Sequence, residues 1–302
     1  MRVTRRTLQL GLGVMWLLDG ALQCQSFMFT SAFGRTIIGE AGSGQPGIVS
    51  DPVHWASQLV IAHPVLTNSA FAAVQLALGI GLLWRRTVRV ALIGSVVWAV
   101  SVWWLGEGLG GLTTGETLLV GAPGAALLYA VVSLLAFPDG SGNSTIAPSK
   151  WAIPAWASLW ITGVGLQLTG GNNTGQALSK SFSDAGSDAG GWIGRIDAHL
   201  AHQHISNLVV AAIVASFAIV AMWSFVPGRW RQASGIAGIA IGLASWVVLQ
   251  GLGALTTGSS TDPNTGPLIL LLGLALLGAP SAPWSEGLLA THSSRRPLAL
   301  PA

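Results

Sequence analysis

The chain has 302 residues, of which 51% are hydrophobic and only 8% are charged. A soluble domain carries about 25% charged residues, so this chain lacks the charges that cover a water-facing surface. The net charge of +3 does not indicate a nucleic-acid partner, because the basic residues stand in short clusters between apolar runs, as in membrane proteins. The single cysteine excludes an internal disulfide and a metal site built from cysteines. We therefore predict an integral membrane protein surrounded by a lipid bilayer.

Eight apolar stretches approach the length of roughly 20 residues that a helix needs to cross a bilayer. The basic start of the chain resembles a signal peptide, but Asp19 interrupts its apolar part, so we expect a retained first helix. A polar break, SGNSTIAPSK, separates the first four stretches from the last four, and the last stretch has the shortest apolar core. The predicted spans are residues 8–29, 65–84, 88–105, 117–137, 151–169, 207–226, 235–255 and 266–284.

Lysine and arginine are distributed unevenly between the two sides of these spans. Eleven of the 14 fall on one side, and only Arg35, Lys180 and Arg195 fall on the other. Cytoplasmic loops carry the excess of basic residues, so both termini are predicted to lie in the cytoplasm, and the protein in the cell (inner) membrane. The long segments 30–64 and 170–206, which hold five of the six histidines, then lie outside.

The two halves of the sequence resemble each other at an offset near 143. GLGGLTTG at 108–115 matches GLGALTTG at 251–258 at seven of eight positions, and MWLLDGALQ at 15–23 matches LWITGVGLQ at 159–167. Four spans per copy is an even number, so both copies enter the membrane from the same side. We predict an all-α membrane protein built from two parallel four-helix repeats, at residues 1–140 and 151–285, with a cytoplasmic linker at 141–150 and a cytoplasmic tail at 286–302.

Two acids of the first copy are the main catalytic candidates. Asp19 lies in the middle of the first span, where a charged carboxylate costs about 3 kcal/mol or more, and intramembrane acids usually serve a function. Gln23 lies one turn further on and can share its site. Glu107 ends the third span, and its counterpart in the second copy is Gln250. The alternatives to a catalytic role are a buried carboxyl group without a function at Asp19 and a solvated acid at a helix end at Glu107.

Other residues are candidates for contacts with a cofactor. Trp103 and Trp104 adjoin Glu107, and with Gln250 they are candidates for contacting one, although tryptophans more often anchor helices at the membrane surface. His63, which lines up with His202, completes a pocket predicted from Asp19, Gln23 and Glu107.

Histidines gather just before the sixth span, in RIDAHLAHQHISN. Imidazole binds transition metals, and His199 and His202 share a helix face at i, i+3. The alternative is a polar segment at the membrane surface whose histidines contact headgroups and water. The predicted metal ligands are Asp197, His199, His202 and His204.

A four-helix unit with a basic N-terminus and the sequence LGLGVMWLLDGALQ resembles the DoxX-type membrane family, and this chain looks like two such units fused. The segment GEGLGGLTTG resembles actinobacterial membrane proteins without an assigned activity. The DoxX resemblance implies a link to quinone-dependent oxidation of sulfur compounds or to thiol redox complexes.

Three functions compete at this point. The first is a redox subunit that binds a quinone or a transition metal and works with a membrane or extracytoplasmic redox partner. The second is a small-molecule or ion transporter with its site between the two repeats. The third is a non-catalytic assembly subunit.

Overall fold

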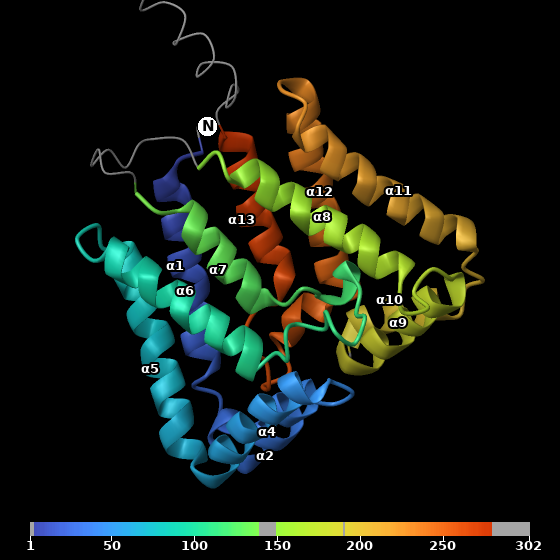
Figure 1. Ribbon diagram of the computed structural model, residues 1–302. Helices are drawn as coiled ribbons and strands as arrows, with labels where there is room; N and C mark the ends of the chain where they lie inside the picture. Colours follow the sequence, from blue (N-terminus) through green and yellow to red (C-terminus); the bar gives the residue numbers. More distant parts are fainter. Residues whose placement is uncertain (1–2, 139–148, 190, 280–302) are drawn as a thin grey trace, which may run out of the picture.

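The computed structural model describes residues 3–138, 149–189 and 191–279, and the regular structure in these ranges is entirely helical (Figure 1). The predicted helical fold class is therefore confirmed. Most of the predicted linker, the predicted tail at 286–302 and the end of the predicted eighth span lie outside the described residues.

The helices of each half lie together (Figure 1). In the first half α1 packs on α5, and α6 packs on α5 and α7; in the second half α8 packs on α11, and α12 packs on α11 and α13. The halves meet chiefly where α13 packs against α7 and α1, and α13 also packs on α8 of its own half. The bounds are α1 Arg5–Leu22, α5 Pro64–Leu83, α6 Val88–Leu105, α7 Ala125–Leu135, α8 Ala152–Leu168, α11 Asn207–Ser224, α12 Arg229–Val248 and α13 Thr265–Gly278.

Each half carries a group of helices at the end remote from the N-terminus (Figure 1). The sequence analysis placed these segments outside the membrane but did not predict their helices. In the first half α4 packs on the short helical turns before it and on α6; in the second half α9 and α10 form a hairpin. Their bounds are η1 Ser26–Phe29, α2 Ser31–Phe33, η2 Gly34–Ile38, α3 Gly39–Ala41, α4 Gly47–Ala62, α9 Gly175–Ala189 and α10 Gly191–Ala201.

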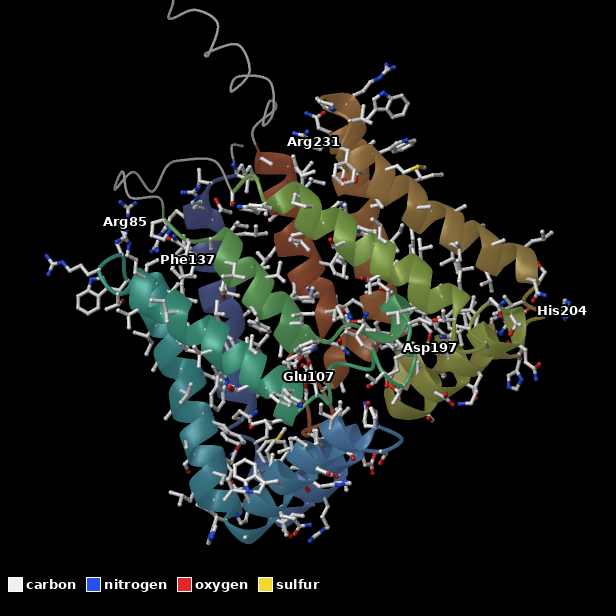
Figure 2. The ribbon with its side chains drawn as sticks, in the orientation of Figure 1. Arg85, Glu107, Phe137, Asp197, His204 and Arg231 are labelled. Atoms are coloured by element: carbon white, nitrogen blue, oxygen red, sulfur yellow. The ribbon has the colours of Figure 1, made fainter. Side chains whose placement is uncertain are left out.

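Three helices, α5, α6 and α11, are long and apolar enough to cross a membrane, and α7, α8 and α13 are shorter apolar helices. These helices indicate a multi-pass membrane protein. Arg85 and Arg231 lie at the end of the molecule where the chain starts, whereas Glu107 and Asp197 lie away from that end (Figure 2).

Some predicted spans are wrong as continuous helices. The stretch 117–137 is an α-helix only from Ala125, because Gly121 and Gly124 have φ angles of 126° and 96°, which no right-handed helix contains. The stretch 235–255 ends its helix at Val248, and the stretch 8–29 ends it at Leu22. The last helix of each half is short, since α7 has 11 residues and α13 has 14.

The two matching glycine-rich segments share an unusual backbone. All four residues of 108–111 have positive φ angles between 52° and 75°, and all four of 251–254 have φ angles between 53° and 69°. Such left-handed conformations cost L-residues roughly 1–2 kcal/mol each and suit glycine. After each turn the chain makes the same hydrogen bond to the helix before the turn. Trp103 Nε1 of α6 donates to Pro123 O at 2.7 Å, and Trp246 Nε1 of α12 donates to Pro263 O at 2.6 Å.

Close packing of α1 on α5 fixes the inner face of α1. A Cβ atom on Gly79 would lie 2.6 Å from Leu17 Cγ, and one on Gly20 would lie 2.7 Å from Leu76 Cγ, so only glycine permits this approach. On the same helix Leu8, Leu12 and Trp16 are buried, one turn apart. Asp19 follows one turn after Trp16 at 2% exposure, and it therefore points into the bundle.

Candidate functional site

An apolar cavity of about 280 Å³ lies in the first half, between α1, α4, α5, α6 and α7. We call it the membrane cavity. Phe71 and Trp98 meet edge to face across 5.5 Å, and Trp16 lies 4.3 Å from Tyr129, measured between ring centroids. Apolar and aromatic side chains provide most of the wall, and the aromatic ones are Trp16, Phe33, Trp55, Phe71, Trp98 and Tyr129.

Buried polar atoms without a hydrogen-bond partner in the protein gather on this cavity. Native proteins pair nearly all such atoms, because each unpaired one costs about 1–3 kcal/mol. The donors are the Trp98 indole N–H and the Tyr129 hydroxyl, and the remaining atoms are acceptors. The five atoms are Asp19 Oδ1, Gln23 Oε1, Gln75 Oε1, Trp98 Nε1 and Tyr129 Oη, and all five residues line the cavity.

Exposed side chains mark a side opening of the membrane cavity between α4 and α6. Trp55 is 64% exposed and Leu59 is 43% exposed, both on α4, and Ser101 on α6 is also exposed. All three line the cavity. The opening therefore lies where α4 of the outer segment packs on α6, one of the helices long and apolar enough to cross a membrane.

Asp19 sits at the polar end of the cavity. The Tyr129 hydroxyl lies beside its carboxyl group. The Trp16 indole, which is tilted by 39° against the Tyr129 ring, donates from Nε1 to Ser95 Oγ at 2.7 Å. Ser95 in turn pairs with Ser133 of α7 at 2.7 Å. This chain of contacts fixes the rings of Trp16 and Tyr129, so that the carboxyl group faces a rigid wall.

Glu107 lies where α6 ends and α7 begins. Its carboxylate accepts a hydrogen bond from the backbone N–H of Ala126 at 3.0 Å, so it caps the N-terminus of α7, where the helix dipole favours negative charge. Burial, and then the nearby Asp262 carboxylate, nevertheless raise the pKa of Glu107 to about 8. Glu107 is therefore both a structural cap and a carboxyl group that can hold a proton near neutral pH.

Asp262 comes from the second half, in the loop before α13. Thr261 Oγ1 donates to Asp262 Oδ2 at 2.8 Å, and the Asn264 backbone N–H donates to Oδ1 at 2.7 Å. Burial raises the pKa of Asp262, and these two hydrogen bonds oppose that shift. Its side chain lines the membrane cavity together with Asp19 and Glu107.

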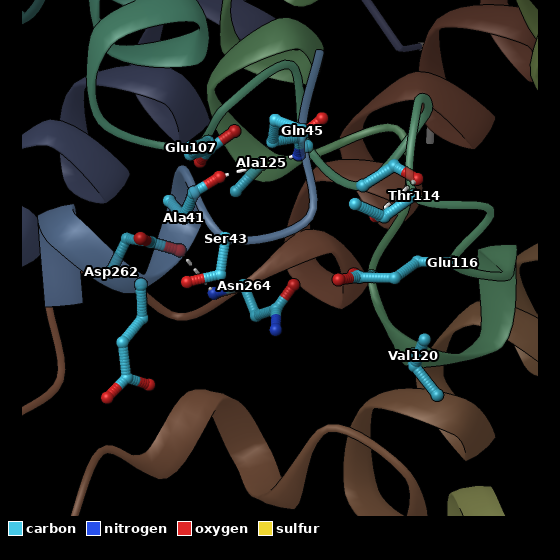
Figure 3. Close-up of a pocket in the computed structure, with 14 residues that line it drawn as sticks. Ala41, Ser43, Gln45, Glu107, Thr114, Glu116, Val120, Ala125, Asp262 and Asn264 are labelled. Carbon is cyan, nitrogen blue, oxygen red and sulfur yellow. Dashed lines mark hydrogen bonds between the residues drawn. The ribbon is translucent and has the colours of Figure 1, made fainter. Parts of the chain in front are cut away.

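A second, polar cavity of about 260 Å³ adjoins the first on the side of the outer segments (Figure 3). We call it the acidic pocket. Asp262 and Glu107 line both cavities, whereas Glu116 and Glu40 line only this one and are exposed. The acidic pocket thus joins the membrane cavity to solvent through carboxyl groups.

The structure brings together only part of the predicted pocket. Asp19, Gln23 and Glu107 line the membrane cavity, as expected for one shared pocket. His63 does not line it, because it is exposed at the junction of α4 and α5.

The residues predicted to contact a cofactor lie elsewhere. Trp104 is 45% exposed, and Trp103 donates its indole N–H to the Pro123 carbonyl oxygen. Gln250 accepts from Thr265 Oγ1 at 3.1 Å and donates to Leu119 O at 3.2 Å. None of the three lines the membrane cavity, so the predicted cofactor contacts are not found there.

The matching region of the second half is packed with side chains. Gly163 stands where the first half has Asp19, and a Cβ atom on it would lie 2.8 Å from Leu118 Cδ2 and 3.1 Å from Phe217 Cδ2. Phe217 is 1% exposed and packs against Trp160, with ring centroids 5.2 Å apart. Around Gly163 the place of a carboxyl group is therefore taken by apolar side chains, from Leu118 of the first half and Phe217 of the second.

The predicted metal ligands do not converge. Asp197 is fully buried on α10, neither of its carboxylate oxygens has a hydrogen-bond partner, and burial raises its pKa to about 6. His199, His202 and His204 are exposed, and His204 lies at the edge of the molecule (Figure 2). Within the described residues no three His, Cys, Asp or Glu side chains are placed to hold a metal ion. Metal binding by this segment stays a prediction that the present arrangement does not favour.

Four residues of the site escaped the sequence analysis: Gln75, Trp98, Tyr129 and Asp262. Two of them carried a signal, because Tyr129 is the single tyrosine of the chain and Gln75 interrupts an otherwise apolar span. Trp98 is one of 14 tryptophans, and Asp262 lies in a loop far along the chain. Nothing local distinguishes these two.

Comparison with known proteins adds no relative. No protein-family model matches the sequence, and neither the curated proteins nor the solved structures give a match.

Proposed function

We propose that this protein binds a membrane-soluble molecule with a planar, polar head group, of the quinone and quinol type, in the membrane cavity. The observation that carries this proposal is the convergence of five unpaired polar atoms on one aromatic-walled cavity. A binding site typically combines apolar walls with a few polar groups that orient the ligand.

The polar groups fit both forms of such a head group. A quinone has two carbonyl oxygens that accept hydrogen bonds, and the Trp98 indole and the Tyr129 hydroxyl are the available donors. A quinol has two hydroxyl groups that also donate, and Gln23, Gln75 and Asp19 provide acceptor oxygens. Aromatic rings on several sides favour a flat ligand over a branched one.

The side opening favours a ligand that arrives from the bilayer. Its rim is formed by the indole of Trp55 and the side chain of Leu59, which suit an apolar tail. Water is the competing occupant, since a volume of about 280 Å³ holds roughly nine molecules at about 30 Å³ each. Water could pair with the five polar atoms but gains nothing from the aromatic walls, whereas a flat organic ring with polar substituents can contact both.

The topology belongs to the same proposal. We propose about eight passes, with both termini in the cytoplasm and the acidic pocket outside, arranged as two parallel four-helix repeats. The left-handed turns at 108–111 and 251–254 and the two indole–carbonyl hydrogen bonds that follow them support the repeat.

The DoxX resemblance agrees with a quinone-linked role. As a redox subunit the protein would exchange the two electrons of the quinol with a membrane or extracytoplasmic partner protein.

A transporter is the second candidate, and one observation favours it. Asp262 and Thr261 of the second half line a cavity that the first half otherwise builds, so the cavity lies close to the boundary between the halves. Movement of a labelled ligand across proteoliposomes would support this function, whereas binding without movement would support the redox subunit.

The experiment is a binding titration on detergent-solubilised protein. A short-tailed benzoquinone and its quinol are titrated by calorimetry against the wild type and the variants Tyr129→Phe, Trp98→Phe and Gln75→Leu. Each variant removes one hydrogen bond worth about 1 kcal/mol, so each should weaken binding by about fivefold. Tyr129→Phe and Trp98→Phe remove donors, so they should affect both ligand forms, whereas Gln75→Leu should affect the quinol more.

Trp192→Phe and Gln203→Leu are the matched controls, because both side chains are exposed in the second half, away from the cavity. Their affinities should equal that of the wild type. If the wild type binds neither the quinone nor the quinol, the proposed function is wrong, and the result favours a non-catalytic assembly subunit. Equal losses in variants and controls would show that binding occurs elsewhere.

A further inference from the structure

Asp262 connects three cavities. Besides the membrane cavity and the acidic pocket, it lines a third cavity of about 300 Å³, which contains Ser259, Ser260 and Gln250 and which we call the serine pocket. Alone among the described residues, Asp262 lines all three. Its carboxyl group therefore stands at both boundaries of the membrane cavity, beside Glu107 where that cavity meets the acidic pocket and beside Thr261 where it meets the serine pocket.

The carboxyl group is held in place but is not neutralised. Thr261 and the Asn264 backbone N–H each donate one hydrogen bond to it, and the next residue, Pro263, is fixed through its carbonyl by Trp246. None of the described residues that line the three cavities is Lys, Arg or His. Carboxyl groups that face one another without a cation share protons, because they cannot all be charged.

The neighbours of Asp262 form a series from buried to exposed. Towards the bilayer lie Asp19 of α1, at 2% exposure, and the Tyr129 hydroxyl of α7. Towards the outside lies Glu107, beside which stands Glu116, exposed to solvent. The titratable groups that surround the route are Asp19, Tyr129, Glu107, Glu116 and Glu40.

We propose that Asp262 is the proton relay between the membrane cavity and the outer solution. A proton leaves a hydroxyl group of the bound ligand, or the Asp19 carboxylic acid, and binds to the Asp262 carboxylate. It then passes to water in the acidic or the serine pocket, either directly or through Glu107, and Asp262 returns to its charged form. No electron moves in this step. The inference rests on the proposed ligand in the membrane cavity, and it makes Asp262 of the second half a functional partner of Asp19.

The test uses a hydroxynaphthoquinone as the probe, because its colour reports the loss of its own hydroxyl proton. The full-length protein in detergent is loaded with the probe, and the external pH is raised in a stopped-flow instrument. Asp262→Asn should keep the affinity for the probe within about twofold and slow its deprotonation by roughly 100-fold, the lower range for loss of a general base. Asp262→Glu retains a carboxyl group and should restore most of the rate.

Asp184→Asn is the matched control, because Asp184 is an exposed aspartate on α9, paired with Lys180, and it lines none of the three cavities. Normal probe affinity with an unchanged rate in Asp262→Asn would overturn the relay and leave the proposed function standing. Lost affinity in Asp262→Asn would overturn it too, since Asp262 would then be a ligand contact. A wild type that does not bind the probe would instead overturn the proposed function.

If Asp262→Asn does not fold, the wild type can be treated with an apolar carbodiimide, which reacts with protonated carboxyl groups. Modification of Asp262, located by mass spectrometry, should slow deprotonation of probe bound afterwards. An unchanged rate in modified protein would overturn the relay.

Discussion

At the scale of single residues, Glu107 shows how one carboxyl group serves two roles. It accepts a hydrogen bond from the Ala126 N–H and so caps α7, and burial, followed by the nearby Asp262 carboxylate, raises its pKa to about 8. The Gln250 counterpart keeps hydrogen bonds, to Leu119 and Thr265, without the charge. The fold therefore needs a hydrogen-bonding side chain at this position, but it does not need an acid.

The raised pKa of Glu107 makes a prediction about stability. A folded-state pKa of about 8, against an ordinary value of 4.5, means that the folded protein holds this proton more tightly than the unfolded chain does. The resulting stability is fully present below about pH 4.5 and is lost as the pH rises through about 8. The Tm of the wild type in detergent should therefore fall between pH 5 and pH 8 by more than the Tm of Glu107→Gln.

Glu40→Gln is the control for this measurement, because Glu40 is an exposed acid of the same pocket. Its Tm should follow the wild-type curve across the pH series. Parallel curves for wild type and Glu107→Gln would show that Glu107 keeps an ordinary pKa, and its role as a proton holder would be lost.

At the scale of elements, the left-handed turns decide where α7 begins. Gly110 has φ 58°, and a Cβ atom on it would overlap the carbonyl oxygen of Pro123. Its counterpart Gly253 has φ 69° and meets Pro263 in the same way. Each of the two helices that follow has an acid at its start: Glu107 accepts from the Ala126 N–H in α7, and Asp262 accepts from the Asn264 N–H just before α13.

This geometry predicts the effect of added methyl groups. Gly110→Ala should lower the free energy of unfolding by about 2 kcal/mol or more, because it combines a left-handed backbone with a steric overlap. Gly165→Ala in α8 is the control, since a Cβ atom there meets nothing within 4 Å and alanine favours a helix. Thermal melting in detergent should show a lower Tm for the first variant only. An unchanged Tm for Gly110→Ala would mean that the turn can relax.

At the scale of the whole molecule, the distribution of charge predicts the topology. Arg85 and Arg231 lie at the N-terminal end, whereas Glu107, which lines the acidic pocket, lies away from that end (Figure 2). Reporter fusions at Gly142, which lies outside the described residues, and at the C-terminus should both report the cytoplasm. A fusion at Gly186, on α9, should report the outside. A reporter at Gly142 that gives the outside would contradict the two-repeat arrangement.

The sequence by itself indicated that lipid surrounds this protein, and it indicated where along the chain the candidate site begins. A chain with 8% charged residues has to place its apolar surface in lipid, and apolar stretches of about 20 residues located α5, α6, α8 and α11 to within a few residues. The cost of a carboxyl group in lipid singled out Asp19 before any contact was known. The turn-spaced Gln23 and the helix-end Glu107 were found by the same reasoning, and both line the cavity.

Only the tertiary structure decided which distant residues join that site. Asp262 stands 243 residues from Asp19 in the chain, and no local pattern predicts that the two line one cavity. His63 was chosen from an alignment of the halves, but the junction of α4 and α5 turns it to the surface. Local patterns report the environment of a residue along its own helix. A cavity depends instead on whether side chains from several helices fill the space between them. Beside Asp19 that space is open, whereas beside Gly163 it is filled by Leu118 and Phe217.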